Sequence, residues 1–303
     1  MQEILERYQV IIYFLAILLG LFIQPNLTTF MNVALGFMLF VTFLQIPIIQ
    51  LHHAFKNLRF ISALFVTNFI AVPIFVGILS FFLPTDPLIQ FAIVFVLLAP
   101  CVDYVISFTG IGNGNSRLLL AFTPVLLIVQ MFIVPFYMHL FLEQNGSTVI
   151  SFLPFLHTLV FFIFIPLILV LITQLISPRI PKLTACLNTM PVPATALVIF
   201  IVIGSVMPQI ELAKTAALTA LPFYLLYAIF APCLGYVMAK TFKLDAYSHR
   251  AILFSSSYRN SFIILPIALA VPNAMPIVPA VILTQTLVEL CFLPIYVKLF
   301  SKI

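Results

Sequence analysis

Charged residues are too scarce in this chain to cover a surface that faces water. They make up 7% of the 303 residues, whereas 64% are hydrophobic and the mean hydropathy is +1.26. A soluble globular domain carries about 25% charged residues, so the composition excludes an ordinary soluble fold and indicates several membrane-spanning helices. The 22 prolines further predict that some of these helices are kinked or broken.

Apolar segments of about 20 residues, the length that crosses a bilayer as a helix, recur along the whole sequence. We predict an all-α polytopic membrane protein with ten transmembrane helices, at residues 9–24, 28–50, 60–83, 87–110, 116–142, 150–177, 190–208, 213–240, 247–271 and 276–300. The basic residues of the short loops then fall on one side, with Lys214 on the other side and Arg259 within a span. The positive-inside rule therefore predicts an integral protein of the plasma (inner) membrane with both termini in the cytoplasm.

Two stretches of similar sequence indicate an internal repeat. QMFIVPFYMHLF begins at Gln130 and ELCFLPIYVKLF at Glu289, an offset of 289 − 130 = 159 residues. Each stretch lies on the fifth span of its half, and an odd number of spans per half gives the two halves opposite orientations. The sequence thus predicts two inverted repeats, 1–142 with spans 1–5 and 150–303 with spans 6–10, and a binding site near the membrane midplane.

The two most polar stretches inside the predicted membrane lie on equivalent spans, the fourth and the ninth. The fourth span, in VLLAPCVDYVISFTGIGNG, contains Cys101 and Asp103. The ninth span contains a polar run made of Ser255, Ser256, Ser257, Tyr258, Arg259 and Asn260. A charge at the bilayer centre costs about 3 kcal/mol, so such charges pair, face a cavity, or do both.

We expect helices four and nine to be broken and to cross at the midplane. The crossing would bring the two charges, Asp103 and Arg259, near each other. Pro100 and the serine run are the predicted causes of the two breaks, whose backbone groups would be left to bind a solute. The structural alternative is an ion pair that only locks two helices together, and near-complete burial would favour it.

The remaining polar residues give weaker signals. Gln130 and Glu289 are equivalent in the repeat, and Glu289, with Thr284 and Gln285, either faces the same cavity or bonds a neighbouring helix. The chain contains no HExxH, Walker or GxSxG motif, so we expect neither an enzyme nor a cofactor. The four cysteines lie in or beside apolar segments, which argues against a disulfide framework and a closed metal cluster. Basic residues are spread over the loops, so nucleic acid is not an expected partner.

At these residues the chain resembles the superfamily that contains the bile acid/sodium symporters and the Cys-dependent arsenite permeases. The resemblance rests on ten spans in two inverted halves, on PCVDYV…GNGNSR in the fourth span and on YRNS in the ninth. It implies sodium ligands on spans four, five and nine, whose positions fall here on Val105, Ile106, Leu119, Thr123, Ser255 and Arg259. Of these positions, only that of Thr123 keeps its ligand type, and Arg259 places a cation where sodium would bind.

The arsenite branch, an arsenic-resistance-like bacterial group, has a cysteine at the place of Cys101. A soft thiolate suits As(III), so the resemblance implies arsenite or metalloid efflux through Cys101 as one alternative function. Sodium-coupled uptake of an organic anion is a further alternative implied by the symporter branch.

We predict a secondary transporter that moves a small anionic or oxyanionic solute by alternating access. Arg259 would bind the anion with help from the serine hydroxyls and Asn260, and Asp103 would balance Arg259 or carry a proton. The candidates for ion coupling are Asp103, Thr123, Gln130 and Glu289. The expected partners are the small anion or metalloid, the lipid bilayer and protons. A receptor or scaffold would need a soluble docking segment, and every predicted loop is short.

Overall fold

The computed structural model describes residues 2–23, 28–44, 57–102, 104–143, 164–207, 210–269, 271 and 274–303. Apart from one isolated bridge, every regular element in these residues is a helix, which confirms the all-helical class expected from the composition. Asp103 and residues 144–163, where the predicted boundary between the two halves falls, lie outside the described residues.

Where the structure describes them, the helices follow the predicted spans closely, and one further short helix (Pro181–Leu187) lies between the predicted sixth and seventh spans. Their bounds are α1 (Gln2–Ile23), α2 (Thr28–Leu44), α3 (Leu58–Val66), a π-helical turn (Thr67–Ala71), α4 (Val72–Ser80), α5 (Pro87–Leu98), α6 (Tyr104–Ile111), α7 (Ser116–Glu143), α9 (Ile165–Ile176), a 3₁₀ turn (Ser177–Arg179), α10 (Pro181–Leu187), α11 (Pro191–Val206), α12 (Ile210–Thr241), α13 (Ala246–Ser257), α14 (Ser261–Ala268) and α15 (Ile277–Phe300).

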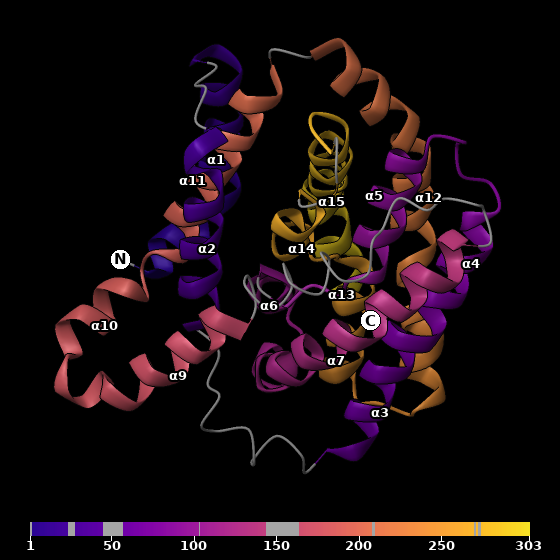
Figure 1. The fold of residues 1–303 in the computed structure, drawn as a ribbon. Coiled ribbons are helices and arrows are strands. Elements are labelled where there is room, and N and C mark those ends of the chain that lie inside the picture. Colours follow the sequence, from indigo (N-terminus) through magenta and orange to yellow (C-terminus); the bar gives the residue numbers. More distant parts are fainter. Residues whose placement is uncertain are drawn as a thin grey trace.

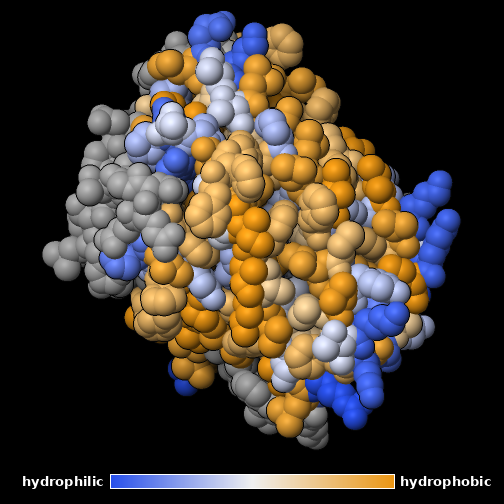
Figure 2. Space-filling model, turned by 90° about the vertical axis from the view of Figure 1, so that its right-hand side faces the viewer, coloured by the Kyte–Doolittle hydropathy of each residue, from blue (hydrophilic) through white to orange (hydrophobic). Residues whose placement is uncertain are grey.

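Three uninterrupted helical segments in the described residues are long and apolar enough to cross a bilayer: Leu58–Ser80, Glu211–Thr241 and Ile277–Phe300. The number rises to five if each of two bent helix pairs, one within α7 and one formed by α10 and α11, is taken as a single span. Figure 2 shows a broad hydrophobic face with hydrophilic residues at its edges, which is the pattern of a surface in contact with lipid. The protein is therefore an integral membrane protein.

The helices form two groups (Figure 1). In one group α11 packs against α1 and α2, and α9 packs against α2. In the other, α12 packs against α13 and α15, and α5 packs against α15 and α7. The groups touch where α11 meets α15 and where α2 meets α14.

Two of the predicted spans are broken in the middle, as expected. The first is α5 followed by α6, and the second is α13 followed by α14. Residue Ala99 ends α5 and Tyr258 ends α13, both with extended backbone, and 258 − 99 = 159, the offset found in the sequence. An aspartate side chain caps the start of each broken helix, Asp86 on α5 and Asp245 on α13, and 245 − 86 is again 159.

The two breaks have different causes. At the first, Pro100 has no N–H to donate to the preceding turn and disfavours helical backbone at Ala99. At the second there is no proline. Instead, the hydroxyls of Ser256 and Ser257 both donate to the Leu253 carbonyl, at 2.9 and 2.6 Å, and such bonds compete with the helical ladder. The Asn260 side chain then caps α14 by accepting from the Ile263 N–H at 3.2 Å.

Candidate functional site

The two breaks are joined to each other through their backbones. The Cys101 N–H donates to the Tyr258 carbonyl at 3.3 Å, and the Asn260 N–H donates to the Ala99 carbonyl at 2.9 Å. Pro100 and Arg259 are thereby paired in an antiparallel bridge. Backbone groups released from the two helices therefore satisfy one another. The crossing brings Pro100 and Arg259, which are 259 − 100 = 159 residues apart in the sequence, close together within the larger helix group.

The Arg259 side chain folds back on the end of α13. Its Nη2 lies 2.7 Å from the Ser255 carbonyl oxygen, 2.9 Å from the Ser256 carbonyl oxygen and 2.9 Å from Oδ1 of Asn68. These carbonyls belong to the last turn of α13, the negative end of its dipole, which favours a cation there. The guanidinium is completely buried, and its three acceptors on Nη2 are neutral oxygens.

Two residues that the sequence did not single out hold this arrangement together. Asn68 lies in the π-helical turn after α3, where its amide nitrogen donates to the Ser255 hydroxyl at 2.9 Å and to the Leu64 carbonyl at 3.0 Å. Tyr227 of α12 places its ring 5.5 Å from the guanidinium carbon and donates its hydroxyl to the Ser256 carbonyl at 2.7 Å. A π-turn in an otherwise α-helical segment is frequent at functional sites.

Several buried atoms around the crossing have no hydrogen-bond partner among the residues that the structure describes. Those on residues 258–261 can all donate: the Tyr258 hydroxyl, Nε and Nη1 of Arg259, Nδ2 of Asn260 and the Ser261 hydroxyl. All four of these residues are completely buried. Leaving a buried donor without an acceptor costs about 1–3 kcal/mol, so this cluster of donors is suited to an acceptor-rich guest, that is, an anion.

Glu289 of α15 also reaches the crossing. Its Oε1 accepts hydrogen bonds from the Arg259 backbone N–H and, at 3.0 Å, from Nε2 of Gln285. Its Oε2 lies 2.7 Å from the hydroxyl of Tyr104, the first residue of α6. Thr284 instead donates to the Ala280 carbonyl of its own helix. Glu289 therefore bonds neighbouring elements at the crossing, which is one of the two possibilities that the sequence left open. The other, that it faces the solute cavity, stays a prediction.

The other sequence candidates lie as follows. Asp103 is outside the described residues, so its predicted contact with Arg259 stays a prediction. Thr123 is buried on α7 and donates to the Leu119 carbonyl at 3.2 Å. Gln130, also buried on α7, has an unpartnered Oε1. Among the described contacts, neither of these two residues bonds to the crossing.

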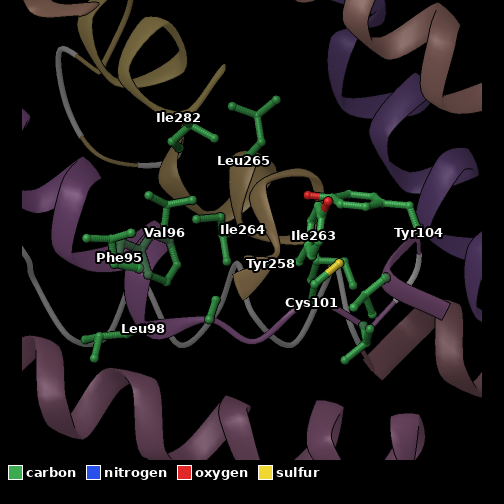
Figure 3. Close-up of a cluster of buried hydrophobic side chains, with 14 of the residues drawn as sticks. Phe95, Val96, Leu98, Cys101, Tyr104, Tyr258, Ile263, Ile264, Leu265 and Ile282 are labelled. Carbon is green, nitrogen blue, oxygen red and sulfur yellow. The ribbon is translucent and has the colours of Figure 1, made fainter. Parts of the chain in front are cut away.

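Cys101 is completely buried, and Figure 3 shows it within an apolar cluster beside Tyr258 and Ile263. The other three cysteines, Cys186, Cys233 and Cys291, are exposed. In the part of the chain that the structure describes, no three His, Cys, Asp or Glu residues come together in a way that could hold a metal ion. The metalloid hypothesis therefore rests on the single thiol of Cys101.

The complete burial of Arg259 favours the structural alternative, whereas the acid of the expected ion pair, Asp103, lies outside the described residues. A cation that only locked two helices together would be expected to have its donors satisfied. Among the described residues, Nη2 donates to neutral oxygens, whereas Nε and Nη1 have no acceptor. The site is a closed, donor-rich centre.

The sequence was also compared with known protein families. The sequence model of the Sodium Bile acid symporter family matches residues 32–215, more than half of the chain. The matched part runs from α2 into α12 and includes the first broken helix pair. Arg259 and Glu289 lie beyond it. No curated protein matches the chain.

Proposed function

The chain belongs to the sodium bile acid symporter family, and we propose that it moves a small anionic or oxyanionic solute through the crossing of the two broken helices. Members of this family are membrane transporters and not enzymes, so transport across the membrane is the general function of this chain. The observation that carries the proposal about the solute is the group of unpartnered buried donors on residues 258–261.

Arg259 is the centre of the proposed solute site. The carbonyls of α13 and the amide of Asn68 hold Nη2, which leaves the donors on Nε and Nη1 for the solute. The start of α14 adds the Asn260 amide and the Ser261 hydroxyl, together with the positive end of that helix dipole. An anion would satisfy several of these groups at once.

A transport cycle requires this site to open. Arg259, Asn260 and Ser261 are each 0% exposed, so the described conformation is closed to the solute. We propose alternating access, in which the group of α1, α2, α9 and α11 moves relative to the larger group. Among the described elements, the two groups meet mainly at α11 with α15 and at α2 with α14, which supports such a movement.

The proposal keeps the ten spans and the two inverted repeats, 1–142 and 150–303. It is supported by the 159-residue offset, which relates both the caps and the ends of α5 and α13. In this arrangement the crossing lies at the membrane midplane, and both termini are in the cytoplasm of a cell bounded by the plasma (inner) membrane.

Sodium-coupled uptake of an organic anion is the second candidate function, and the family match favours it. Its sodium dependence is tested by replacing sodium with potassium in a transport assay, because a sodium-coupled carrier stops concentrating its solute under that change. Arsenite efflux through Cys101 is a third hypothesis. Arsenite tolerance conferred on an efflux-deficient bacterium, and lost on Cys101→Ser, would establish it.

A binding screen tests the anion proposal. Purified protein is heated with a panel of anions, including a bile acid anion, a dicarboxylate and sulfate, and the shift in Tm is recorded for each. We expect at least one anion to stabilise the wild type, and the shift to vanish in Arg259→Gln. Arg117→Gln, at an exposed arginine of α7, is the matched control and should behave as the wild type. Equal shifts in all three proteins would contradict the proposal.

A further inference from the structure

The Tyr104 hydroxyl lies between two oxygen atoms. It is 2.8 Å from the Arg259 carbonyl oxygen and 2.7 Å from Oε2 of Glu289. A tyrosine hydroxyl has one proton to donate. If the Glu289 carboxylate were ionised, both neighbours would be acceptors only, and one of these two short contacts would contain no proton.

A proton on Oε2 of Glu289 removes this conflict. Glu289 then donates to the Tyr104 oxygen, and Tyr104 donates to the Arg259 carbonyl. Oε1 becomes the carbonyl oxygen of the acid, and its two lone pairs accept from the Arg259 N–H and from Gln285. With the proton in place, each contact of the carboxyl group has one donor and one acceptor.

The surroundings of Glu289 also favour the neutral acid. The side chain is 2% exposed, and its three contacts are a hydroxyl, a backbone N–H and an amide. Buried charges in proteins are usually paired with an opposite charge, but the nitrogen of Arg259 that bonds Glu289 is the backbone one. The guanidinium is instead directed at the carbonyls of α13.

The titratable groups facing Glu289 from the elements packed around it are mostly tyrosines: Tyr104 on α6, Tyr224 and Tyr227 on α12, Tyr258 and Arg259 at the second break, and Tyr296 on its own helix. The sequences of α5, α11 and α14, which also pack against α15, contain no titratable side chain. Arg259 is the one full positive charge in this described set.

We propose that Glu289 binds a proton in this closed conformation and that this proton is coupled to the opening of the crossing. Losing the proton to water would leave Tyr104 facing two acceptors, so one of its two hydrogen bonds would break. Because Tyr104 joins α6 and α15 to the Arg259 carbonyl, deprotonation loosens the contact between the two breaks. The proton's position follows from the contacts alone, whereas its coupling to solute movement rests on the proposed transport function.

Infrared spectroscopy of the purified protein tests the proton directly, without any solute. A protonated carboxylic acid has a C=O stretching band that is distinct from the bands of a carboxylate and shifts in D2O. We expect this band in the wild type at neutral pH, and its loss in Glu289→Gln. Glu211→Gln, at an exposed acid of α12, is the matched control and should keep the band.

Two further variants make the assignment specific. Asp103→Asn should retain the band, which separates Glu289 from the other acid predicted to lie in the membrane. Tyr104→Phe should retain the band but move its frequency, because the acid loses its acceptor. Absence of the band in the wild type, or its loss in Asp103→Asn alone, would overturn the proposal.

The test does not fail if the Glu289→Gln variant is unable to fold. The amide of Glu289→Gln can donate to Tyr104 as the neutral acid does, so we expect this variant to fold. If it did not, the frequency in Tyr104→Phe would decide, since an unchanged band would place the proton elsewhere. A failure to transport any anion would leave these spectra, and therefore the proton assignment, unaffected.

Discussion

The two breaks have nearly the same backbone but very different side chains. Each ends a helix with an extended residue, and two hydrogen bonds join them. The first is imposed by Pro100 and is lined by apolar residues and Cys101. The second is imposed by polar side chains and carries Arg259 and Asn260. One backbone geometry is thus reached in two ways. Among the described residues, the second break supplies the cation and the unpartnered donors.

The difference assigns separate roles to the two breaks. The first contributes backbone groups that hold the second in place, and we interpret it mainly as a scaffold. The second contributes the cation, with Glu289 and Tyr104 next to it. Substitutions at the second break should therefore affect the solute most strongly, and substitutions at the first should act mainly through stability.

The largest effect is expected for Arg259→Gln. Losing a hydrogen-bonded charge removes about 3 kcal/mol of solute binding, roughly 100-fold in affinity. Arg259→Lys keeps the charge but has fewer donors, so its affinity should fall between the two. The affinity of all three proteins for the anion identified by thermal shift is measured by titration. Equal affinities in Arg259→Gln and wild type would contradict the different roles assigned to the two breaks.

The next effect is expected at Glu289 and concerns stability. Glu289→Ala leaves the Tyr104 hydroxyl, the Arg259 N–H and the Gln285 amide without their acceptor, and should cost about 3 kcal/mol of unfolding free energy. Glu289→Gln preserves the hydrogen-bond pattern of the neutral acid and should cost less than about 1 kcal/mol. Denaturant unfolding in detergent distinguishes them. A similar loss in both variants would argue against a neutral Glu289.

A smaller effect is expected at the first break. Pro100→Ala gives the unfolded chain more freedom and should cost about 1 kcal/mol, while the affinity for the anion changes little. Pro181→Ala, at the exposed start of α10, is the control for the general effect of losing a proline. If Pro100→Ala reduced affinity as much as Arg259→Gln, the first break would be part of the solute site and more than a scaffold.

The smallest effects are expected at the two aspartate caps. Asp86→Ala and Asp245→Ala should each cost about 0.5 kcal/mol, the low end for an N-cap. Similar losses would support the structural equivalence of α5 and α13, and a loss at one cap alone would weaken it.

The cap at Asp245 should also depend on pH. Burial raises the pKa of Asp245, but hydrogen bonds from the side chain and backbone of Ser248 outweigh this and lower it below its usual value. Because the folded pKa is the lower one, the stabilisation is complete above the unfolded pKa of about 3.9 and is lost as the pH falls through the folded value. The difference in Tm between wild type and Asp245→Ala should therefore shrink in acid, and a difference that grew would contradict this sign.

The sequence predicted the positions of the helices and of both breaks, because long apolar runs, Pro100 and the serine run each have a local effect on the backbone. It also predicted that Arg259 lies near the membrane centre, from the cost of a charge in an apolar environment, and it left two possibilities open for Glu289. It did not reveal Asn68, Tyr104 or Tyr227. Each is a single residue with a polar side-chain group in an apolar segment. Its role depends on which face of its helix packs against the crossing, and this is decided by tertiary packing. The direction of the Arg259 side chain could not be predicted from the sequence for the same reason.

The most direct test of the account is transport by the protein reconstituted into liposomes. Uptake of labelled anions, namely a bile acid anion, a dicarboxylate and sulfate, is measured for wild type, Arg259→Gln, Arg259→Lys and the control Arg117→Gln. We predict uptake of at least one anion by the wild type and by Arg117→Gln, reduced uptake by Arg259→Lys and none by Arg259→Gln. Uptake by Arg259→Gln at the wild-type rate would contradict the central role of Arg259.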